Sequence, residues 1–282
     1  MSIYDINKKT LTGVYDIDKQ KVKSVYNIKG DSVWSESNTD LPDIQNTLKI
    51  MTYNVCVFTG RNTSSTISHI INLYTPDIIG LQEVYGSVLP SEFNSIFNDY
   101  MYSTFGIQAN KTALVSKLKM SDISQGIFLS QTIEQRGYNK AYIEFNGKRI
   151  CLINTHLETT DGGTAKANQA KEIYDIVKNE EYFIVIGDFN TICKSISDNE
   201  YKTIMLQFIN DGCNSANCSE QFGFNNTWTD SYSLLSSDSY PCDHIITSKN
   251  IEILEVVYDM YKTTINSSYS IDHIPVIATL KI

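Results

Sequence analysis

Apolar, strand-like segments of this sequence carry polar side chains where the apolar run ends or begins. Carboxylate oxygens suit hard divalent cations, and an imidazole can act as a general acid. A rigid scaffold presents a site by delivering such groups at the tips of its strands, so we expect these residues to converge. The residues are Asn54, Glu83, His156, Asp188, Asn190, Asp243, Asp272 and His273.

Each of these residues also has an ordinary explanation. Asn54 is compatible with a strand-ending turn, and Glu83 and His156 are compatible with solvated strand ends. The segment GDFN, residues 187–190, follows a five-residue apolar run and also makes a good turn. The ordered set is a stronger indication of a site than any single member.

The elements that must position these residues are many strands and few helices. Helical spacing of apolar residues occurs in STISHIINLY and GTAKANQAKEIYDIVKNE. This pattern predicts two packed sheets flanked by helices. The predicted strands are LKIMTYNV, PDIIGLQEV, TALVSK, KAYIEF, KRICLINTHL, YFIVIGDFN, CDHIITS, IEILEVVYDMY and IPVIATLKI.

Length and composition favour one catalytic domain. The chain has 282 residues, of which 41% are hydrophobic, and this is enough to bury one large core. A formal net charge of −9 argues against non-specific nucleic-acid binding through a broad basic face. Neither a membrane span nor a signal peptide is expected, which predicts a soluble protein, cytoplasmic or part of a larger particle.

Cysteine spacing adds little to the functional prediction. The six cysteines form no CxxC pair and no zinc-binding spacing. Cys213 and Cys218 lie in the loop-like segment DGCNSANCSE, and they are the two cysteines that could form a disulfide. Whether they pair stays open at the level of sequence.

The first 34 residues repeat with a period of eleven, as IYDINKKTLTG, VYDIDKQKVKS and VYNIKGDSVWS. Their alternating Val, Tyr and Ile residues predict short strands, too few to bury a core alone. We expect residues 1–34 to form homo-oligomers, to dock on a larger assembly, or to pack on their own domain. Residues 35–47 are a predicted linker, and residues 48–282 form the predicted catalytic domain.

The motifs TYN, LQE, NTHLE, GDFN, CDHI and SIDHIPV occur in the order and approximate spacing of the endonuclease/exonuclease/phosphatase superfamily. The sequence resembles this superfamily, which includes deoxyribonuclease I-like enzymes, over residues 48–282. The resemblance implies an α/β fold, a four-layer α/β/β/α sandwich with the site at one end of both sheets. The N-terminal β-repeats are an addition to that fold.

The resemblance also implies roles for the strand-end residues. Glu83 and Asp272 would be metal ligands, and Asn54 would lie close to the metal and the scissile phosphate. The implied metal is Mg²⁺ or Mn²⁺, with Ca²⁺ as a further possibility, because hard carboxylate oxygens suit these ions. Asp188 would orient or deprotonate the attacking water, helped by the amide of Asn190.

Two histidines and an aspartate complete the implied machinery. His273 would contact the phosphate while Asp243 holds its ring. His156 stands where apurinic endonucleases have tyrosine, and it would act as a general acid toward the leaving oxygen. His244 is best explained as a packed side chain.

Three basic residues near the motifs are candidates for contacts with a substrate phosphate, namely Arg136, Lys140 and Lys166. Each is also compatible with a charge on a solvated surface.

These features predict a metal-dependent phosphoesterase that hydrolyses a phosphodiester by in-line attack of water. A nuclease acting on nucleic acid is the first expectation for the substrate. A lipid phosphodiesterase similar to sphingomyelinases, or a phosphomonoesterase, uses the same core. The alternative from another class is a non-catalytic assembly module.

Overall fold

In this computed structural model, the chain divides into two units, residues 1–45 and residues 46–282. In the first unit, β1 (Ser24–Tyr26) pairs antiparallel with β2 (Ser32–Ser35). The rest of the predicted repeats, most of the predicted linker and Asp272 lie outside the described residues. Those residues are 24–26, 32–35, 46–56, 64–84, 96–106, 112–131, 134–159, 164–191, 195, 197–223, 225–229, 239–259 and 273–282.

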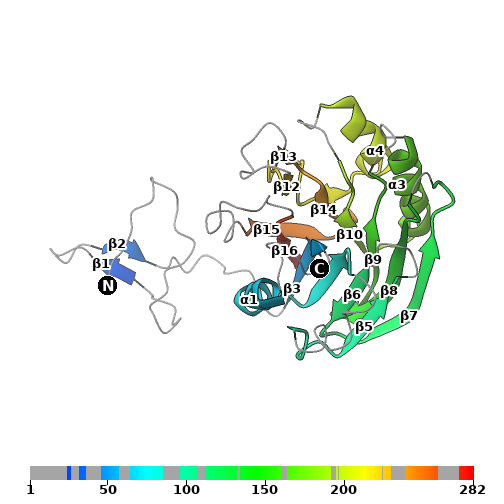
Figure 1. Cartoon of the computed structure of the whole chain (residues 1–282). Helices are drawn as coiled ribbons and strands as arrows, with labels where there is room; N and C mark the ends of the chain where they lie inside the picture. The colour runs from blue at the N-terminus through cyan, green and yellow to red at the C-terminus, as the bar shows by residue number, and fades with distance from the viewer. Residues whose placement is uncertain are drawn as a thin grey trace. The chain divides into compact units, whose positions relative to one another are not determined.

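The second unit contains two six-stranded mixed sheets (Figure 1). In one of them, which we call the β3 sheet, β3 and β4 are parallel neighbours at the centre. Its strand order is β15 (Glu252–Tyr258), β16 (Val276–Lys281), β3 (Thr47–Asn54), β4 (Ile78–Gln82), β6 (Ala113–Ser116) and β5 (Tyr102–Phe105).

The other sheet, which we call the β10 sheet, has β9 and β10 as parallel neighbours. Two further short strands, β12 (Trp228–Thr229) and β13 (Ser239–Tyr240), pair with each other. The strand order of the β10 sheet is β11 (Asn214–Ser215), β14 (Asp243–Thr247), β10 (Phe183–Asp188), β9 (Lys148–His156), β8 (Gly137–Phe145) and β7 (Met120–Ile127).

Helices cover the outer faces of the two sheets. The apolar side of α1 (Ser64–Tyr74) packs on the β3 sheet. The apolar sides of α3 (Thr164–Val177) and α4 (Asn199–Asn210) pack on the β10 sheet. The inner faces of the two sheets share a third core between them. The predicted four-layer α/β/β/α sandwich is confirmed.

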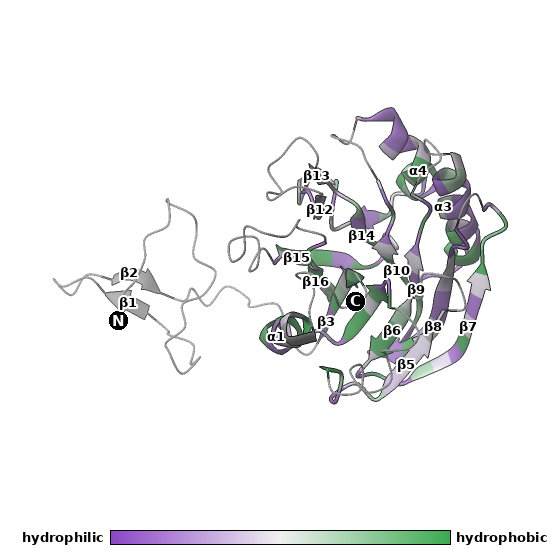
Figure 2. Cartoon of the chain, viewed as in Figure 1, coloured by the Kyte–Doolittle hydropathy of each residue, from purple (hydrophilic) through white to green (hydrophobic). Residues whose placement is uncertain are grey.

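Side-chain alternation explains why polar residues gather at one end of this sandwich. In β9, Ile150 and Leu152 point into the core between the sheets, whereas Cys151 and Ile153 point toward the helices. The inward row of β9 ends on His156. Several strands of the β3 sheet carry hydrophobic colour along their length, as expected for strands buried on both faces (Figure 2).

Two elements, β7 and α4, were not predicted from the sequence, for different reasons. β7 is an edge strand whose middle residues are exposed, so it lacks an apolar run. α4 has helical spacing in its buried residues Tyr201, Ile204, Met205 and Phe208, and this pattern was available in the sequence. No helix among the described segments has the length and hydropathy to cross a bilayer.

Close approach of the two sheets generates a stability prediction. A Cβ atom added to Gly80 would lie 2.4 Å from Ile186 Cδ1 and 2.7 Å from Asn154 Oδ1. We expect Gly80→Ala to lower the free energy of unfolding by about 1–3 kcal/mol, because overpacking a dense core displaces its side chains. Denaturant unfolding measures this loss.

The matched control for Gly80→Ala removes the atom that lies nearest to the added Cβ. Adding Ile186→Val deletes Cδ1, so the double variant should be less destabilised than the sum of the two single variants. Additive losses would contradict the proposed contact between the sheets.

Candidate active site

Strand pairing places the predicted site residues in one transverse row on the inner face of the β10 sheet. Asp243 pairs with Asp188, Asp188 with His156, and His156 with Gly137. Paired residues on neighbouring strands direct their side chains to the same face. The ends of four strands therefore present two carboxylates and an imidazole side by side.

Asn54, from the opposite sheet, connects this row with Glu83. Its Nδ2 donates to Glu83 Oε1 at 3.1 Å and to Asp188 Oδ2 at 3.0 Å. Its Oδ1 accepts from the backbone nitrogen of Cys56 at 3.0 Å. Asn54 thus presents its amide hydrogens to both carboxylates, and its oxygen is held by the backbone.

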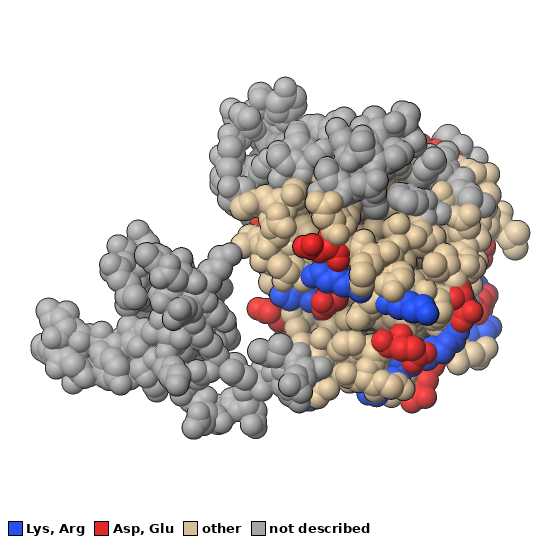
Figure 3. All heavy atoms as spheres, turned by 90° about the horizontal axis from the view of Figure 1, so that it is seen from below, with Lys and Arg blue, Asp and Glu red and all other residues tan. Residues whose placement is uncertain are grey.

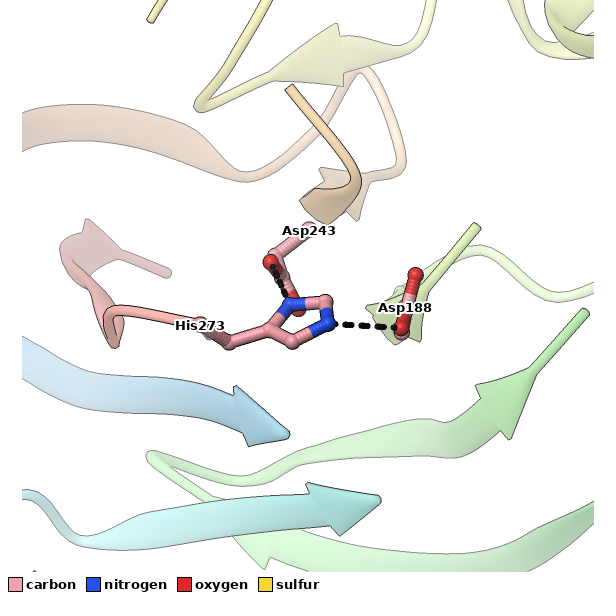
Figure 4. Close-up of side chains that lie close together, drawn as sticks. All are labelled: Asp188, Asp243 and His273. Atoms are coloured by element: carbon pink, nitrogen blue, oxygen red, sulfur yellow. Dashed lines mark hydrogen bonds and ion pairs between the residues drawn. The ribbon is translucent and has the colours of Figure 1, made fainter. Parts of the chain in front are cut away.

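His273 lies between the two aspartates of the row (Figure 4). Its Nδ1 lies 2.8 Å from Asp243 Oδ2, and its Nε2 lies 3.5 Å from Asp188 Oδ2. Thr227 Oγ1 donates to Asp243 Oδ2 at 2.6 Å and accepts from Asp243 N at 3.0 Å. A β-bridge between Trp228 and His273 fixes the backbone that carries the imidazole.

His156 and Arg136 form a buried basic pair beside Asp188. His156 Nε2 lies 3.4 Å from Asp188 Oδ2. Burial lowers the pKa of His156 well below its usual value, and the charges of Arg136 and His273 lower it further. Arg136 is 2% exposed and pairs with Glu134 at 2.6 Å, but its Nε and Nη1 have no hydrogen-bond partner among the described residues. Within the same part of the chain, His156 Nδ1 is also buried without a partner.

Asp188 is the most constrained carboxylate of the site. Burial raises its pKa to about 6, with Asp243 also raising it, while His273 and the hydrogen bonds from Asn54 and Asn190 lower it. The backbone nitrogen of Asn190 donates to Asp188 Oδ1 at 2.8 Å, and Asn190 Nδ2 donates to a backbone carbonyl at 2.9 Å. The Asn190 amide therefore anchors the loop, and its backbone orients the carboxylate.

Glycine is required immediately before Asp188. Gly187 has φ of 154°, and a Cβ added there would lie 2.2 Å from the backbone oxygen of Thr155. Positive φ also occurs at Cys56, Glu83 and Asn190, which follow β3, β4 and β10 at the site. Strained backbone of this kind is common where a fold holds functional groups in place.

The site fits a divalent cation on its donor chemistry. One ligand atom from each of Asp188, Asp243 and His273 lies within 4.8 Å of the others, and all three residues are buried. Asp243 Oδ1 is buried without a hydrogen-bond partner in the segments that the structure describes. Buried carboxylate oxygens are costly unless a cation or donor balances them, so this acidic group is suited to lie beside a hard metal ion.

The structure does not bring all three predicted phosphate contacts to this site. Lys140 lies on the helix-facing side of β8, over the ring of Tyr142 at 5.0 Å. Lys166 has no exposed surface, and its Nζ donates to Asn190 O at 2.9 Å and to Glu200 at 3.3 Å. Lys166 thus holds the loop that carries Asn190, and of the three basic residues only Arg136 lies beside His156.

Two supporting residues were not predicted as parts of the site. Thr227, in a loop-like segment, has no sequence signal that distinguishes it from other threonines. His244 is buried behind the row, where burial lowers its pKa to about 4, and its Nε2 lies 2.9 Å from Thr191 Oγ1. It is a packed side chain, as expected. No disulfide joins Cys213 and Cys218.

Comparisons with known proteins agree with this geometry. A family model described as the Endonuclease/Exonuclease/phosphatase family matches residues 51–259. The chain is similar to Sphingomyelinase C of Bacillus cereus, at 24% identity over 277 residues that cover 78% of this chain and 80% of that protein. A second Bacillus cereus Sphingomyelinase C matches at 24% identity over 89% of this chain and 93% of its own length.

Solved structures show the same fold. An endonuclease/exonuclease/phosphatase from Bacteroides vulgatus superposes with a TM-score of 0.67 at 18% identity, covering 84% of this chain and 99% of that chain. D. rerio TDP2, complexed with a single-strand DNA product, superposes with a TM-score of 0.65 at 17% identity, with the same coverages.

The Thr227 contacts generate a prediction about the support of the site. Thr227→Val keeps the shape but leaves the backbone nitrogen of Asp243 unpaired, which should cost about 1–3 kcal/mol of unfolding free energy. We expect kcat to fall by about 10-fold to 100-fold, the usual effect of removing a hydrogen bond that holds an active-site residue in place.

Thr203→Val is the control for this substitution, because the exposed Thr203 hydroxyl bonds only to Asn199 O, at 2.7 Å on the surface of α4. Equal kcat for the two variants would show that Thr227 does not support the site.

Proposed function

This chain belongs to the endonuclease/exonuclease/phosphatase family and is a metal-dependent phosphoesterase, and we propose that it hydrolyses the phosphodiester bond of a sphingomyelin-type phospholipid. The observation that carries the reaction is the buried row of Asp188, Asp243 and His156, completed by His273 from the end of the chain. The similarity to Sphingomyelinase C over most of both chains supports the substrate.

Charge also favours a lipid over nucleic acid. The net charge is −9, and basic side chains are interspersed with acidic ones on the face shown in Figure 3. A polyanion is bound mainly through Lys and Arg contacts with its phosphates. A nuclease, the first expectation from the sequence, becomes the second candidate, because the likeness to TDP2 supports the fold alone.

Asp188 is the proposed group that orients and deprotonates the attacking water. Its raised pKa makes it a better base than an exposed aspartate, which would accept a proton less readily. Asn54 and the backbone of Asn190 fix its two oxygens, so that one direction of approach is preferred. This arrangement reduces the entropy that must be lost at the transition state.

The phosphate is expected to lie against His273, His156 and Arg136. Asp243 holds His273 through Nδ1, which directs Nε2 toward Asp188 Oδ2, and the phosphate is proposed to bind beside this edge of the ring. The unpaired buried Nε and Nη1 of Arg136 are suited to a phosphate oxygen. Because a bound anion raises the pKa of an adjacent imidazole, substrate binding favours the form of His156 that can protonate the leaving oxygen.

The proposed metal ligands are Glu83 and Asp272, with Asn54 beside them. A divalent cation, Mg²⁺ or Mn²⁺ with Ca²⁺ as an alternative, would neutralise phosphate charge and lower the cost of forming the nucleophile. Asn54 fixes Glu83 toward Asp188, which keeps the acidic groups close enough to share a cation.

The proposed function is tested with a panel of substrates in Mg²⁺, comprising sphingomyelin vesicles, plasmid DNA, RNA and bis-nitrophenyl phosphate. We expect sphingomyelin to be the best substrate, EDTA to abolish its hydrolysis, and Asp188→Ala to lower kcat by about 10²–10⁴-fold. Glu83→Gln should raise the Mg²⁺ concentration needed for half activity.

Asp175→Ala is the matched control, because Asp175 is an exposed residue of α3 that pairs with Lys171 and Lys178. Faster turnover of DNA than of sphingomyelin would replace the lipid assignment with the nuclease. Full turnover in EDTA would contradict the metal assignment.

The histidines provide a separate prediction about the mechanism. His273→Ala and His156→Ala should each lower kcat by about 10² or more, the range for a positioned acid or base. Asp243→Asn should be less damaging than His273→Ala, because the imidazole is still present.

His69→Ala, on the exposed face of α1, should leave kcat unchanged and is the control for the loss of a histidine. If both active-site histidine variants keep more than about half of the wild-type kcat on the best substrate, the assigned roles are wrong.

A further inference from the structure

The row of active-site residues continues beyond His156 onto the edge strand of the β10 sheet. His156 pairs with Gly137, and Gly137 pairs with Ile127 at the end of β7. All three positions face the same side of the sheet. Gly137 has no side chain, so none stands in the row between His156 and Ile127. One end of the row therefore carries the apolar side chain of Ile127, and the other end carries the carboxylates of Asp188 and Asp243.

The turn after Ile127 is held firmly by polar contacts. The backbone nitrogens of Leu129 and Ser130 donate to the two carboxylate oxygens of Glu172 on α3, at 2.8 and 3.1 Å. Gln169 Nε2 donates to Ser130 O at 2.7 Å. Phe128 is buried and packs against the ring of Tyr138, with centroids 5.7 Å apart.

This fixed turn exposes apolar side chains to solvent. Leu129 is 92% exposed, the highest value among the large hydrophobic residues that the structure describes, and Ile127 is 38% exposed. The segment that follows β7 is coloured hydrophobic in Figure 2. A single exposed leucine is ordinary on a protein surface. Here, however, the backbone is anchored and the neighbouring isoleucine belongs to the row of the active site.

We propose that Ile127 and Leu129 contact the apolar part of a phospholipid substrate at the surface of an uncharged, zwitterionic bilayer. The inference rests on the proposed function and adds the orientation of the substrate. His156 is the group proposed for the leaving oxygen, and the apolar side chains lie beyond it. The leaving alcohol of a sphingomyelin-type lipid carries the hydrocarbon chains, so its position matches the apolar end of the row.

The charges of the protein favour this kind of membrane over an anionic one. The net charge of −9 repels an anionic surface. Near the turn, Glu172 accepts hydrogen bonds from its backbone, and Glu134 follows it closely in the sequence. Binding by insertion of apolar side chains needs no basic surface. The fixed backbone lowers the entropy lost when Leu129 enters the lipid.

The test compares Leu129→Ser and Ile127→Thr with Leu73→Ser. Leu73 is 50% exposed near the end of α1. The next residue, Tyr74, accepts a hydrogen bond through its backbone oxygen from Lys49 Nζ at 3.1 Å. Because Lys49 lies near the start of β3, this end of α1 is away from the site. Three quantities are measured for each variant: cosedimentation with sphingomyelin/phosphatidylcholine vesicles in EDTA, turnover of the same vesicles in Mg²⁺, and turnover of bis-nitrophenyl phosphate.

We expect Leu129→Ser to weaken vesicle binding and vesicle turnover by about tenfold or more, because serine has no apolar side chain to transfer from water into the lipid. Ile127→Thr should lower vesicle turnover more than vesicle binding, since Ile127 lies in the row. Turnover of bis-nitrophenyl phosphate should be unchanged in Leu129→Ser, and Leu73→Ser should match the wild type in every measurement.

Vesicle binding and turnover within about twofold of the wild type in both variants would overturn the inference while leaving the lipid substrate intact. If the wild type hydrolyses bis-nitrophenyl phosphate but no vesicle lipid, the lipid substrate is wrong and with it the proposed orientation. Leu129→Ser could instead show a lower mass than the wild type in light scattering while its vesicle binding is unchanged. This result would mean that Leu129 contacts another copy of the chain, and it would also overturn the inference.

Discussion

The hydrogen bonds from one amide group, Asn54 Nδ2, join the polar ends of the two sheets. This group donates to Glu83, which directly follows β4 of the same sheet, and to Asp188 in the opposite sheet. Deeper between the sheets, Gln82 Nε2 donates to Asn154 Oδ1 at 2.7 Å, and Asn154 Nδ2 donates to two backbone carbonyls of the β3 sheet. Because buried polar groups are costly when unpaired, these contacts fix how the sheets meet.

The polar contacts between the sheets explain how an apolar core can end in an active site. The inner faces are filled by Ile, Leu and Val over most of their length and become polar over the last positions. Gln82 pairs with Asn154 of the other sheet and Asn54 pairs with Asp188, so burial continues up to Asp188. A carboxylate held in that environment resists ionisation, which is why its pKa is raised.

The same row also gives the site a direction. Carboxylates and His273 occupy one end, and His156, Gly137 and Ile127 continue toward the edge strand. Substrates with a charged phosphate and a large apolar alcohol have the same asymmetry. The chemistry of a phosphoesterase is thus determined by the centre of the row, while the preference among substrates depends on what lies at its ends.

The sequence by itself determined the sandwich and most of the site. Asn54, Glu83, His156, Asp188 and His273 were predicted to lie together because each stands at the end of an apolar strand and because the order of their motifs resembles that of a known superfamily. Local pattern did not determine how Asn54 is oriented, since its amide is shared between residues distant in the chain. Nor could it separate Arg136 from Lys140 and Lys166, because all three are basic residues near motifs.

Only the tertiary structure decided which of these groups lie beside His156. Lys166 is buried under the loop of Asn190, and Lys140 lies on the other face of its strand. The tertiary structure also placed Ile127 in the row, because the pairing of β7 with β8 and of β8 with β9 is set by register. Register depends on contacts between strands, and a polar edge strand such as β7 carries little of that information in its own sequence.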